Sequence, residues 1–475
     1  MDKTFRKLLA LLLIGILCMT MLTACGGKKE EPDPKPVDPA DPVEPEEIVY
    51  TIDNIRDYVV GVDELVELED GTMTPLINFD NAATTPPLKP VMDFVDSEMK
   101  MYGSIGRGFS QKSNHSTDFY EMTRETVMNF VNADPNEYVC FYVNTTTDGL
   151  NKLASAVIES EDDLVLCTRM EHHANDLPWR ERCNVIYAEV DEMGRVIYDD
   201  IERLLTENEG KVKYVCVSAA SNITGYVNDV HRVAKMAHAH GAKIVVDGAQ
   251  IVAHRRFSMM GDTPEENIDF FVFSAHKMYS PYGGGIVNIV TDFEQTYKNA
   301  PTSYEAGSPN YAGVVGMARA MEVLNEVGFD AISEHEQKLL HRAIDGLNKI
   351  DNVIIYGDWE HTEDRVGVIT FNFEDLNSYY VALRLTNESG VATRRGAFCA
   401  HPYVWRLMGI SDEEAKGYVN CMDMKTPGMI RISFGIYNTE EEVDQFLVDL
   451  NKVVDELREQ MLAQPEHLMF EYPNY

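Results

Sequence analysis

Residues 76–290 alternate short runs rich in β-branched and aromatic residues with stretches of helical spacing. This alternation is typical of a doubly wound α/β domain, in which helices connect successive parallel strands. The run "FFVFS" at 270–274 is apolar until its last residue, as expected for a buried strand of such a sheet. We therefore predict an α/β fold with a mostly parallel sheet.

Several of the predicted strands end in polar side chains. The run "VKYVCVS" is followed by Ser221 and Asn222, "AKIVV" by Asp247 and Gln250, and "DFFVF" by Ser274, His276 and Lys277. In open parallel sheets, ligands bind at the carboxyl ends of the strands. These side chains are therefore expected to lie in one site.

A site that combines a lysine, an aspartate and hydroxyl groups suits pyridoxal 5'-phosphate (PLP). A lysine that loses its charge in a desolvated pocket can form a Schiff base with a carbonyl cofactor, and an aspartate can keep a pyridine nitrogen protonated. The segment "NTTTDGLNKLASAV" at 144–157 places three threonines before a helical pattern, where backbone N–H groups and hydroxyls can bind phosphate. Taken alone, the same threonines are more typical of an ordinary helix N-cap.

Seven further motifs occur in an order that resembles a known enzyme family: "NFDNAATTPP", "MEHHANDLPW", "SNITGYVNDV", "VDGAQIVAH", "FSAHKMYSPYGGG", "RRGAFCAHP" and "IRISFGIYNTEEEVDQF". Over residues 77–450 the chain resembles class V aminotransferase-fold enzymes, most of all the SUF-type cysteine desulfurases, also called cysteine/selenocysteine lyases. The resemblance implies PLP-dependent fold type I, which is aspartate aminotransferase-like and has a large domain and a smaller C-terminal α/β domain. It also implies that L-cysteine is converted to L-alanine, with sulfur transfer through a cysteine persulfide.

The resemblance assigns cofactor-binding roles by motif position. It implies that Lys277 forms the Schiff base, that Asp247 pairs with the pyridine nitrogen and that Gln250 bonds the phenolic oxygen. The phosphate would be held by Thr146, Thr147, Ser274, His276 and, from the second subunit of a homodimer, Ser308.

Substrate-binding and catalytic roles follow from the same resemblance. Asn222 and Arg431 would bind the α-carboxylate of the substrate, and Arg394 would help to close the site. The catalytic residues would be Lys277, Cys399 as the nucleophile, and His172, whose ring would stack on the cofactor. One departure from the family lies beside the nucleophile, where Ala397 and Phe398 replace residues that are commonly polar or histidine.

Other interpretations of these residues stay open. His172 and His173 could be metal ligands or surface residues, but adjacent histidines do not share a helical face as an i, i+4 pair does, so no metal site is predicted. A second possibility is another PLP reaction on an amino acid, such as transamination, β-elimination or epimerization, in which Cys399 is not catalytic. A third is a lipoprotein that binds an amino acid without turning it over. Lys277 and Asp247 argue against that third possibility, because a binding protein has no use for an electron sink.

The N-terminus is expected to be a targeting segment. Residues 1–25 combine the basic residues Lys3, Arg6 and Lys7 with an apolar stretch too short to span a membrane comfortably, followed by "LTAC". This arrangement resembles a bacterial lipoprotein signal that would place a lipidated Cys25 at the mature N-terminus; the alternative is an uncleaved anchor. Either form would hold the protein at the membrane, facing out of the cytoplasm.

The rest of the chain divides by composition. Residues 26–47 are rich in proline and acidic residues and are predicted to form an extended tether. They would be followed by an N-terminal segment at 48–75, the PLP-binding large domain at 76–327 and the small domain at 328–475. The formal charge of -37 argues against nucleic-acid binding. Cysteines from Cys140 onward show no C-x-x-C pairing, so neither a zinc site nor a disulfide framework is predicted.

Overall fold

The computed structural model describes residues 48–283, 285–289, 301, 304–305, 307–418 and 426–463. The predicted signal peptide, its Cys25 and the predicted tether lie outside these residues. The chain divides into two units, Met1–Ile48 and Val49–Tyr475, and the helices and strands given below belong to the second unit. Among the described residues, none of the helices has the length and apolar character needed to cross a membrane.

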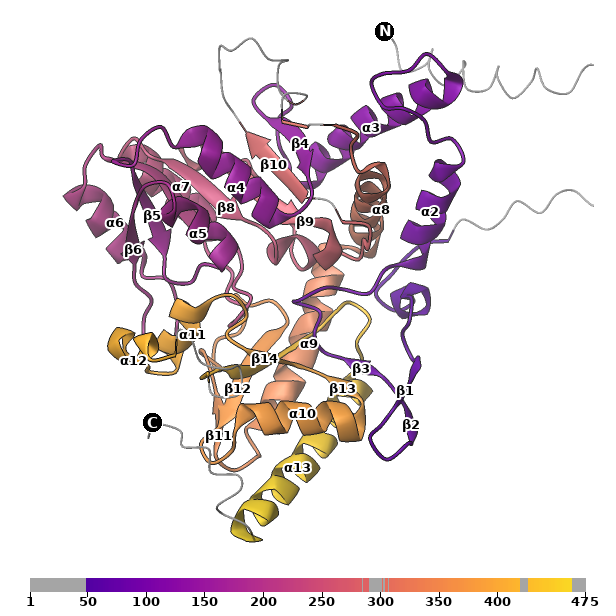
Figure 1. Ribbon diagram of the computed structural model, residues 1–475, viewed down its shortest axis with the longest axis vertical. Helices are drawn as coiled ribbons and strands as arrows, with labels where there is room; N and C mark the ends of the chain where they lie inside the picture. The colour runs from indigo at the N-terminus through magenta and orange to yellow at the C-terminus, as the bar shows by residue number, and fades with distance from the viewer. Residues whose placement is uncertain are drawn as a thin grey trace, which may run out of the picture. The chain divides into compact units, whose positions relative to one another are not determined.

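A seven-stranded sheet forms the centre of the larger half of the molecule (Figure 1). Its strands lie in the order β4 (Val139–Val143), β10 (Gly285–Ile289), β9 (Phe270–Ser274), β8 (Lys243–Asp247), β7 (Val212–Ser218), β5 (Leu164–Thr168) and β6 (Asn184–Ala188). Strand β10 is antiparallel to both of its neighbours, and the pairs from β9 to β6 are parallel. The predicted α/β fold with a mostly parallel sheet is thereby confirmed.

Helices cover both faces of this sheet, which explains why its strands are apolar on both sides. Along β9, Phe270 and Val272 belong to one core cluster and Phe271 and Phe273 to the other, and all four side chains are fully buried. The first cluster packs against α4 (Thr146–Val157) and α5 (Leu177–Arg180). The second packs against α3 (Gln111–Phe130), α6 (Tyr198–Glu207), α7 (Val230–Ala239) and α8 (Tyr311–Val327).

A second, four-stranded antiparallel sheet has its own core. Its strands lie in the order β11 (Val353–Ile355), β12 (Val368–Phe373), β15 (Met429–Ser433) and β14 (Arg394–Gly396). The residues that bury its apolar face come from α9 (Phe329–Leu347), α10 (Ser378–Ser389) and α13 (Glu440–Ala463). Figure 1 shows α9 running from the larger half into this smaller one.

Shorter elements link the two halves. The parallel pair β3 (Ile77–Asn78) and β13 (Val391–Ala392) brings the start of the "NFDNAATTPP" motif beside the small sheet. The remaining elements are η1 (Ile55–Tyr58), β1 (Leu65–Glu67), β2 (Met73–Pro75), α2 (Lys89–Met99), η2 (His173–Asn175), η3 (Ile251–Ala253), η4 (Pro264–Glu266), η5 (Ala275–Lys277), α11 (His401–Leu407) and α12 (Asp412–Lys416). Gly328 lies between α8 and α9, next to the predicted domain boundary at 327/328, which stays a prediction.

Candidate active site

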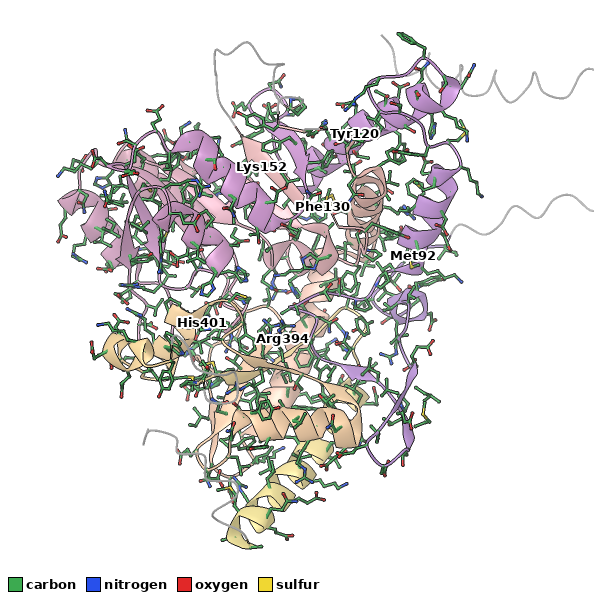
Figure 2. The ribbon with its side chains drawn as sticks, in the orientation of Figure 1. Met92, Tyr120, Phe130, Lys152, Arg394 and His401 are labelled. Atoms are coloured by element: carbon green, nitrogen blue, oxygen red, sulfur yellow. The ribbon has the colours of Figure 1, made fainter. Side chains whose placement is uncertain are left out.

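A cavity of about 420 Å³ lies at the carboxyl ends of the strands of the large sheet and also receives residues of the small sheet. Figure 2 shows the labelled Arg394 and His401 in the region between the two sheets. The cavity is lined by nearly all of the predicted site residues: Thr146, Thr147, His172, Asn222, Asp247, Gln250, Ser274, His276, Lys277, Arg394, Cys399 and Arg431. Ser308 is exposed and does not line the cavity of this single chain.

Lys277 and Asp247 both line the cavity because Asp247 ends β8 and Lys277 lies in η5, directly after β9. Asp247 is the last residue of β8, is 5% exposed and accepts a hydrogen bond from the backbone N–H of Ala249 at 2.9 Å. Burial lowers the pKa of Lys277 to about 8, an effect that the charge of Asp247 opposes. Burial also raises the pKa of Asp247 above its ordinary value. Lys277 therefore has a neutral amine at mildly alkaline pH.

The start of α4 and the end of β9 form a group of hydroxyl donors on one side of the cavity. The Thr145 side chain caps α4 by accepting from the Asp148 N–H at 3.1 Å. The Thr146 N–H donates to Ser274 Oγ at 2.8 Å, and the two hydroxyl oxygens lie 2.6 Å apart. His276 Nδ1 lies 3.2 Å from Thr84 Oγ1. The positive end of a helix dipole beside several hydroxyls is suited to an anionic group.

His172 lines the cavity as a neutral ring. Its Nδ1 accepts a hydrogen bond from the Ala174 N–H at 3.0 Å, so the proton of the neutral ring lies on Nε2. Burial, with the nearby charge of Lys277 as a second cause, lowers its pKa to about 3. The ring is therefore uncharged throughout the physiological range.

The carboxyl group of Glu171, the residue before His172, is fixed by four donors. It accepts from Thr168 Oγ1, Asn175 Nδ2 and both the N–H and the hydroxyl of Ser218, at 2.6 to 3.0 Å. Glu171 is 3% exposed, and burial raises its pKa to about 7. This network fixes the backbone that carries His172 against β7.

Arg431 enters the cavity from β15 and pairs with a carboxylate of the chain. Its Nη2 lies 3.0 Å from Asp80 Oδ1, and its Nη1 donates to the carbonyl oxygen of Asn222 at 3.1 Å. Asp80 also pairs with Arg394 through its second oxygen, at 3.3 Å. Burial lowers the pKa of Arg431 to about 10, with the Asp80 carboxylate opposing the shift. The two arginines make this end of the cavity electropositive.

Cys399 differs from the other described cysteines in its exposure. Cys140, Cys167 and Cys216 are buried, Cys183 is partly buried, and Cys399 is exposed and lines the cavity. Burial raises the pKa of the three buried thiols, which keeps them protonated. Among the described cysteines, Cys399 is therefore the one placed to act as a nucleophile in the cavity.

Two residues that the sequence analysis did not single out shape this site. Asp80 pairs with both arginines, and Glu171 anchors the His172 segment. Both residues lie inside motifs quoted above, "NFDNAATTPP" and "MEHHANDLPW". Glu171 directly precedes the predicted His172, which was the available signal, whereas the arginine partners of Asp80 lie 314 and 351 positions away in the sequence.

Comparisons with known proteins show the family of the chain. The model of the family described as "Aminotransferase class-V" matches residues 77–446. A protein of Halalkalibacterium halodurans named "Probable cysteine desulfurase" is 32% identical over 80% of this chain and 93% of its own length. A cysteine desulfurase of Escherichia coli is 31% identical over 86% of this chain and 99% of its own length.

Solved structures show the same similarity. The apo structure of a cysteine desulfurase from Thermococcus onnurineus has a TM-score of 0.72 and 28% identity, covering 85% of this chain and 98% of that one. The structure of the E. coli cysteine desulfurase CsdA, at 23% identity, has a TM-score of 0.67 over 86% of this chain and 100% of that one, and supports the fold.

The chain belongs to the class V aminotransferase family. Its relatives and its cavity indicate a PLP-dependent enzyme, and within the family its function is cysteine desulfurase-like. The fold is accordingly that of PLP-dependent fold type I, as the sequence resemblance implied.

The donor set of the cavity fits PLP. Lys277 Nζ has no hydrogen-bond or ion-pair partner among the described residues, although it lines the cavity, so a carbonyl group can reach it. The buried Asp247 carboxylate is suited to a protonated ring nitrogen, and the hydroxyls at the start of α4 are suited to a phosphate.

Proposed function

We propose that the protein is a PLP-dependent cysteine desulfurase that converts L-cysteine to L-alanine and receives the sulfur atom on Cys399. The observation that carries this proposal is an exposed thiol in the same cavity as a lysine of lowered pKa. A β-elimination or a transamination would need the lysine but not the thiol.

We propose the following cofactor contacts. Lys277 would hold the cofactor carbonyl carbon, Asp247 the ring nitrogen and Gln250 the phenolic oxygen, while the neutral His172 ring would lie against the ring face. Thr146, Thr147, Ser274 and His276 would bind the phosphate. When bound, PLP supplies an electron sink for the α-carbon of an amino acid.

The chain's own residues would then bind and activate the substrate. Arg431 and Asn222 would bind the α-carboxylate, and Arg394 would add positive charge at the cavity mouth. Lys277 Nζ, neutral near pH 8, would accept the α-proton. Because the His172 ring is uncharged, it would pack against the cofactor without repelling the nearby Lys277.

Sulfur transfer would use the thiolate of Cys399, which lines the cavity together with Arg394 and Arg431. A bond forms between the Cys399 sulfur and the substrate sulfur while the bond from the substrate β-carbon to its sulfur breaks. The products are L-alanine and a Cys399 persulfide, so L-cysteine plus one thiol gives alanine plus one persulfide with no external oxidant.

The decisive measurement is alanine formation from L-cysteine by the chain from Gly26 onward, loaded with PLP and supplied with a reductant. The parent should form alanine, and a Cys399→Ala variant should bind PLP equally well but form none. Alanine formation that persists in Cys399→Ala would contradict the assignment of Cys399 as the nucleophile. PLP binding without alanine formation in the parent would redirect the assignment to another reaction on an amino acid.

We propose in addition that the enzyme is a homodimer in which Ser308 contributes to the phosphate site of the second subunit. Support comes from the exposure of Ser308 in the single chain and from the family resemblance. Light scattering should give twice the mass of the chain, and Ser308→Ala should weaken PLP binding without changing that mass. A monomer with full PLP affinity would contradict this arrangement.

We also propose that Cys25 is lipidated and that the enzyme is anchored outside the cytoplasmic membrane. The basic, apolar and cysteine-terminated segment at 1–25 supports this proposal. After fractionation of cells, the full chain should be recovered in the membrane fraction. A Cys25→Ser variant should be recovered outside the membrane fraction. Recovery of the parent chain in the cytosol would contradict the anchor.

A further inference from the structure

Phe398, the residue before Cys399, covers the groups that are proposed to bind the substrate carboxylate. The guanidinium carbon of Arg431 lies 4.7 Å from the centroid of the Phe398 ring. This is the geometry of a cation–π contact, which is strengthened when both partners are shielded from water. The aromatic ring therefore shields the guanidinium of Arg431, whereas the N–H groups at its edge, which a carboxylate needs, point to Asp80 and to the Asn222 carbonyl oxygen.

The second carboxylate-binding group is held by the backbone of the same residue. Asn222 Nδ2 donates to the carbonyl oxygen of Phe398 at 2.9 Å. Arg431 and Asn222 are only 2% and 8% exposed although both line the cavity. Phe398 thus contacts both groups, covering Arg431 with its ring and accepting from Asn222 with its carbonyl oxygen.

The Phe398–Cys399 segment is held in an unfavourable backbone conformation. Phe398 and Cys399 have φ angles of 49° and 56°, in the left-handed region that residues with a side chain rarely adopt. Such strain persists only where surrounding contacts hold it. Here those contacts include the Asn222 amide on the Phe398 carbonyl and the His173 N–H on the Cys399 carbonyl, at 2.7 Å.

We propose that Phe398 is the gate of the α-carboxylate site and a specificity-determining residue of the enzyme. A ligand carboxylate replaces the Phe398 carbonyl oxygen on Asn222, and the segment then moves and takes the Phe398 ring off Arg431. This movement releases the strained backbone that carries Cys399. Recognition of the carboxylate is thereby coupled to movement of the nucleophile. The inference rests on the proposed function, since it takes Arg431 and Asn222 as the carboxylate-binding groups.

The proposed gate predicts the direction in which the affinity for L-alanine changes when Phe398 is replaced, and this direction distinguishes a gate from a residue that only supports Arg431. If the ring must leave Arg431 when the ligand binds, Phe398→Ala should tighten binding of L-alanine, the product, by roughly 3- to 30-fold, the range expected when a cation–π contact made only by the unbound form is removed. Phe398→Tyr, which keeps an aromatic face over Arg431, should bind L-alanine like the parent. If the ring only oriented Arg431, Phe398→Ala would bind more weakly.

The experiment titrates the PLP-loaded parent and both variants with L-alanine and with L-alaninamide, following the visible absorbance of the cofactor. L-Alaninamide lacks the carboxylate, so its affinity should not change in Phe398→Ala. Unchanged or weaker L-alanine binding in Phe398→Ala would overturn the gate, and so would equal tightening for both probes. Should Phe398→Ala fail to take up PLP, Phe398→Leu replaces it in the experiment. Because leucine has no aromatic face, this variant should also bind L-alanine more tightly and L-alaninamide with unchanged affinity.

A second readout needs no variant. Release of the segment removes the acceptor of the His173 N–H, so L-alanine should speed hydrogen exchange at that amide in the parent, and L-alaninamide should not. Slower or unchanged exchange with L-alanine overturns the coupling. If L-alanine gives neither the tighter binding nor the faster exchange but alanine is still produced from L-cysteine, the gate is overturned and the proposed reaction stands. An intact gate response without alanine production would overturn the reaction alone, and failure to bind L-alanine would overturn both.

Discussion

At the scale of single residues, burial sets the charge state of the site. Lys277 has a pKa of about 8, His172 of about 3 and Arg431 of about 10, each lowered chiefly by loss of hydration. The consequence differs for each side chain. Lys277 becomes available as a neutral nucleophile and base, His172 stays neutral, and Arg431 remains a cation that depends on Asp80 for its charge partner.

The lowered pKa of Lys277 can be measured directly on the PLP-free protein. The neutral amine is the reactive form, so acetylation of Lys277 by acetic anhydride should rise with pH and reach half its maximal rate near pH 8, whereas an ordinary lysine titrates near 10.4. Peptide mass spectrometry after timed labelling gives the rate. In Asp247→Asn, which loses a negative charge that raises the pKa of Lys277, the midpoint should fall further. A midpoint near pH 10 in the parent would contradict the prediction.

The pairing of Asp80 with Arg431 predicts a loss of stability on removing the carboxylate charge. Asp80→Asn leaves a 2% exposed guanidinium without its charge partner. We expect a loss of about 1 to 3 kcal/mol, because breaking a buried ion pair is costly and Asp80 itself keeps some solvent contact. Chemical denaturation of the PLP-free protein measures this loss.

A matched control uses an exposed carboxylate. Asp444 pairs with Arg342 on the surface, where both side chains are well exposed. Asp444→Asn should therefore leave the unfolding midpoint nearly unchanged. Equal effects of Asp80→Asn and Asp444→Asn would show that the Asp80 pair has no special role.

At the scale of elements, the site depends on how closely strands and turns approach one another. Gly248 follows Asp247 at the end of β8, and a Cβ atom there would lie 2.2 Å from the ring of Phe271 on β9. No side chain fits in that space, because the Phe271 ring is fully buried. The glycine therefore lets the Asp247 turn pack directly on the neighbouring strand.

Gly248→Ala should consequently distort the turn that carries Asp247 and Gln250. We expect destabilisation of roughly 1 to 3 kcal/mol, typical of overpacking, together with weaker PLP binding. Gly367→Ala is the control, since a Cβ atom at that position meets its nearest neighbours at an ordinary 3.4 Å. Thermal unfolding and a PLP titration of both variants test this, and normal PLP affinity in Gly248→Ala would refute it.

At the scale of the whole molecule, the cavity joins the two sheets. Lys277 and Asp247 follow strands of the seven-stranded sheet, whereas Arg394 and Arg431 come from the four-stranded sheet. Figure 2 shows Arg394 at this junction. A cofactor bound there contacts groups that depend on both halves being folded, so its binding should stabilise the molecule as a unit.

Removal of PLP should therefore lower the unfolding temperature. A ligand at 100 times its dissociation constant stabilises the folded state by about 2.7 kcal/mol, which corresponds to a shift of a few degrees. Calorimetry of the PLP-free and PLP-loaded forms measures the shift. In Lys277→Ala the shift should shrink and the absorbance band that arises from the bond between PLP and Lys277 should disappear. An unchanged shift would argue that Lys277 does not hold PLP.

The sequence determined the local part of this architecture. Apolar strand patterns and the polar residues after them, such as Asp247 after "AKIVV", predicted a mostly parallel sheet with a site at its carboxyl edge, and the structure has both. The sheet and its site could be predicted because side-chain periodicity and the rule that ligands bind at the carboxyl ends of strands depend on short stretches of chain. Motif resemblance then supplied the distant residues Arg394, Cys399 and Arg431.

Only the tertiary structure decided the contacts between those distant segments. The pairing of Asp80 with Arg431 joins residues 351 positions apart, and the bond from Asn222 to the Phe398 carbonyl joins residues 176 positions apart. No periodicity or local propensity encodes such partners, because they are set by how two separately cored sheets pack against each other. The position of the Phe398 ring over Arg431, and with it the proposed gate, follows from that packing alone.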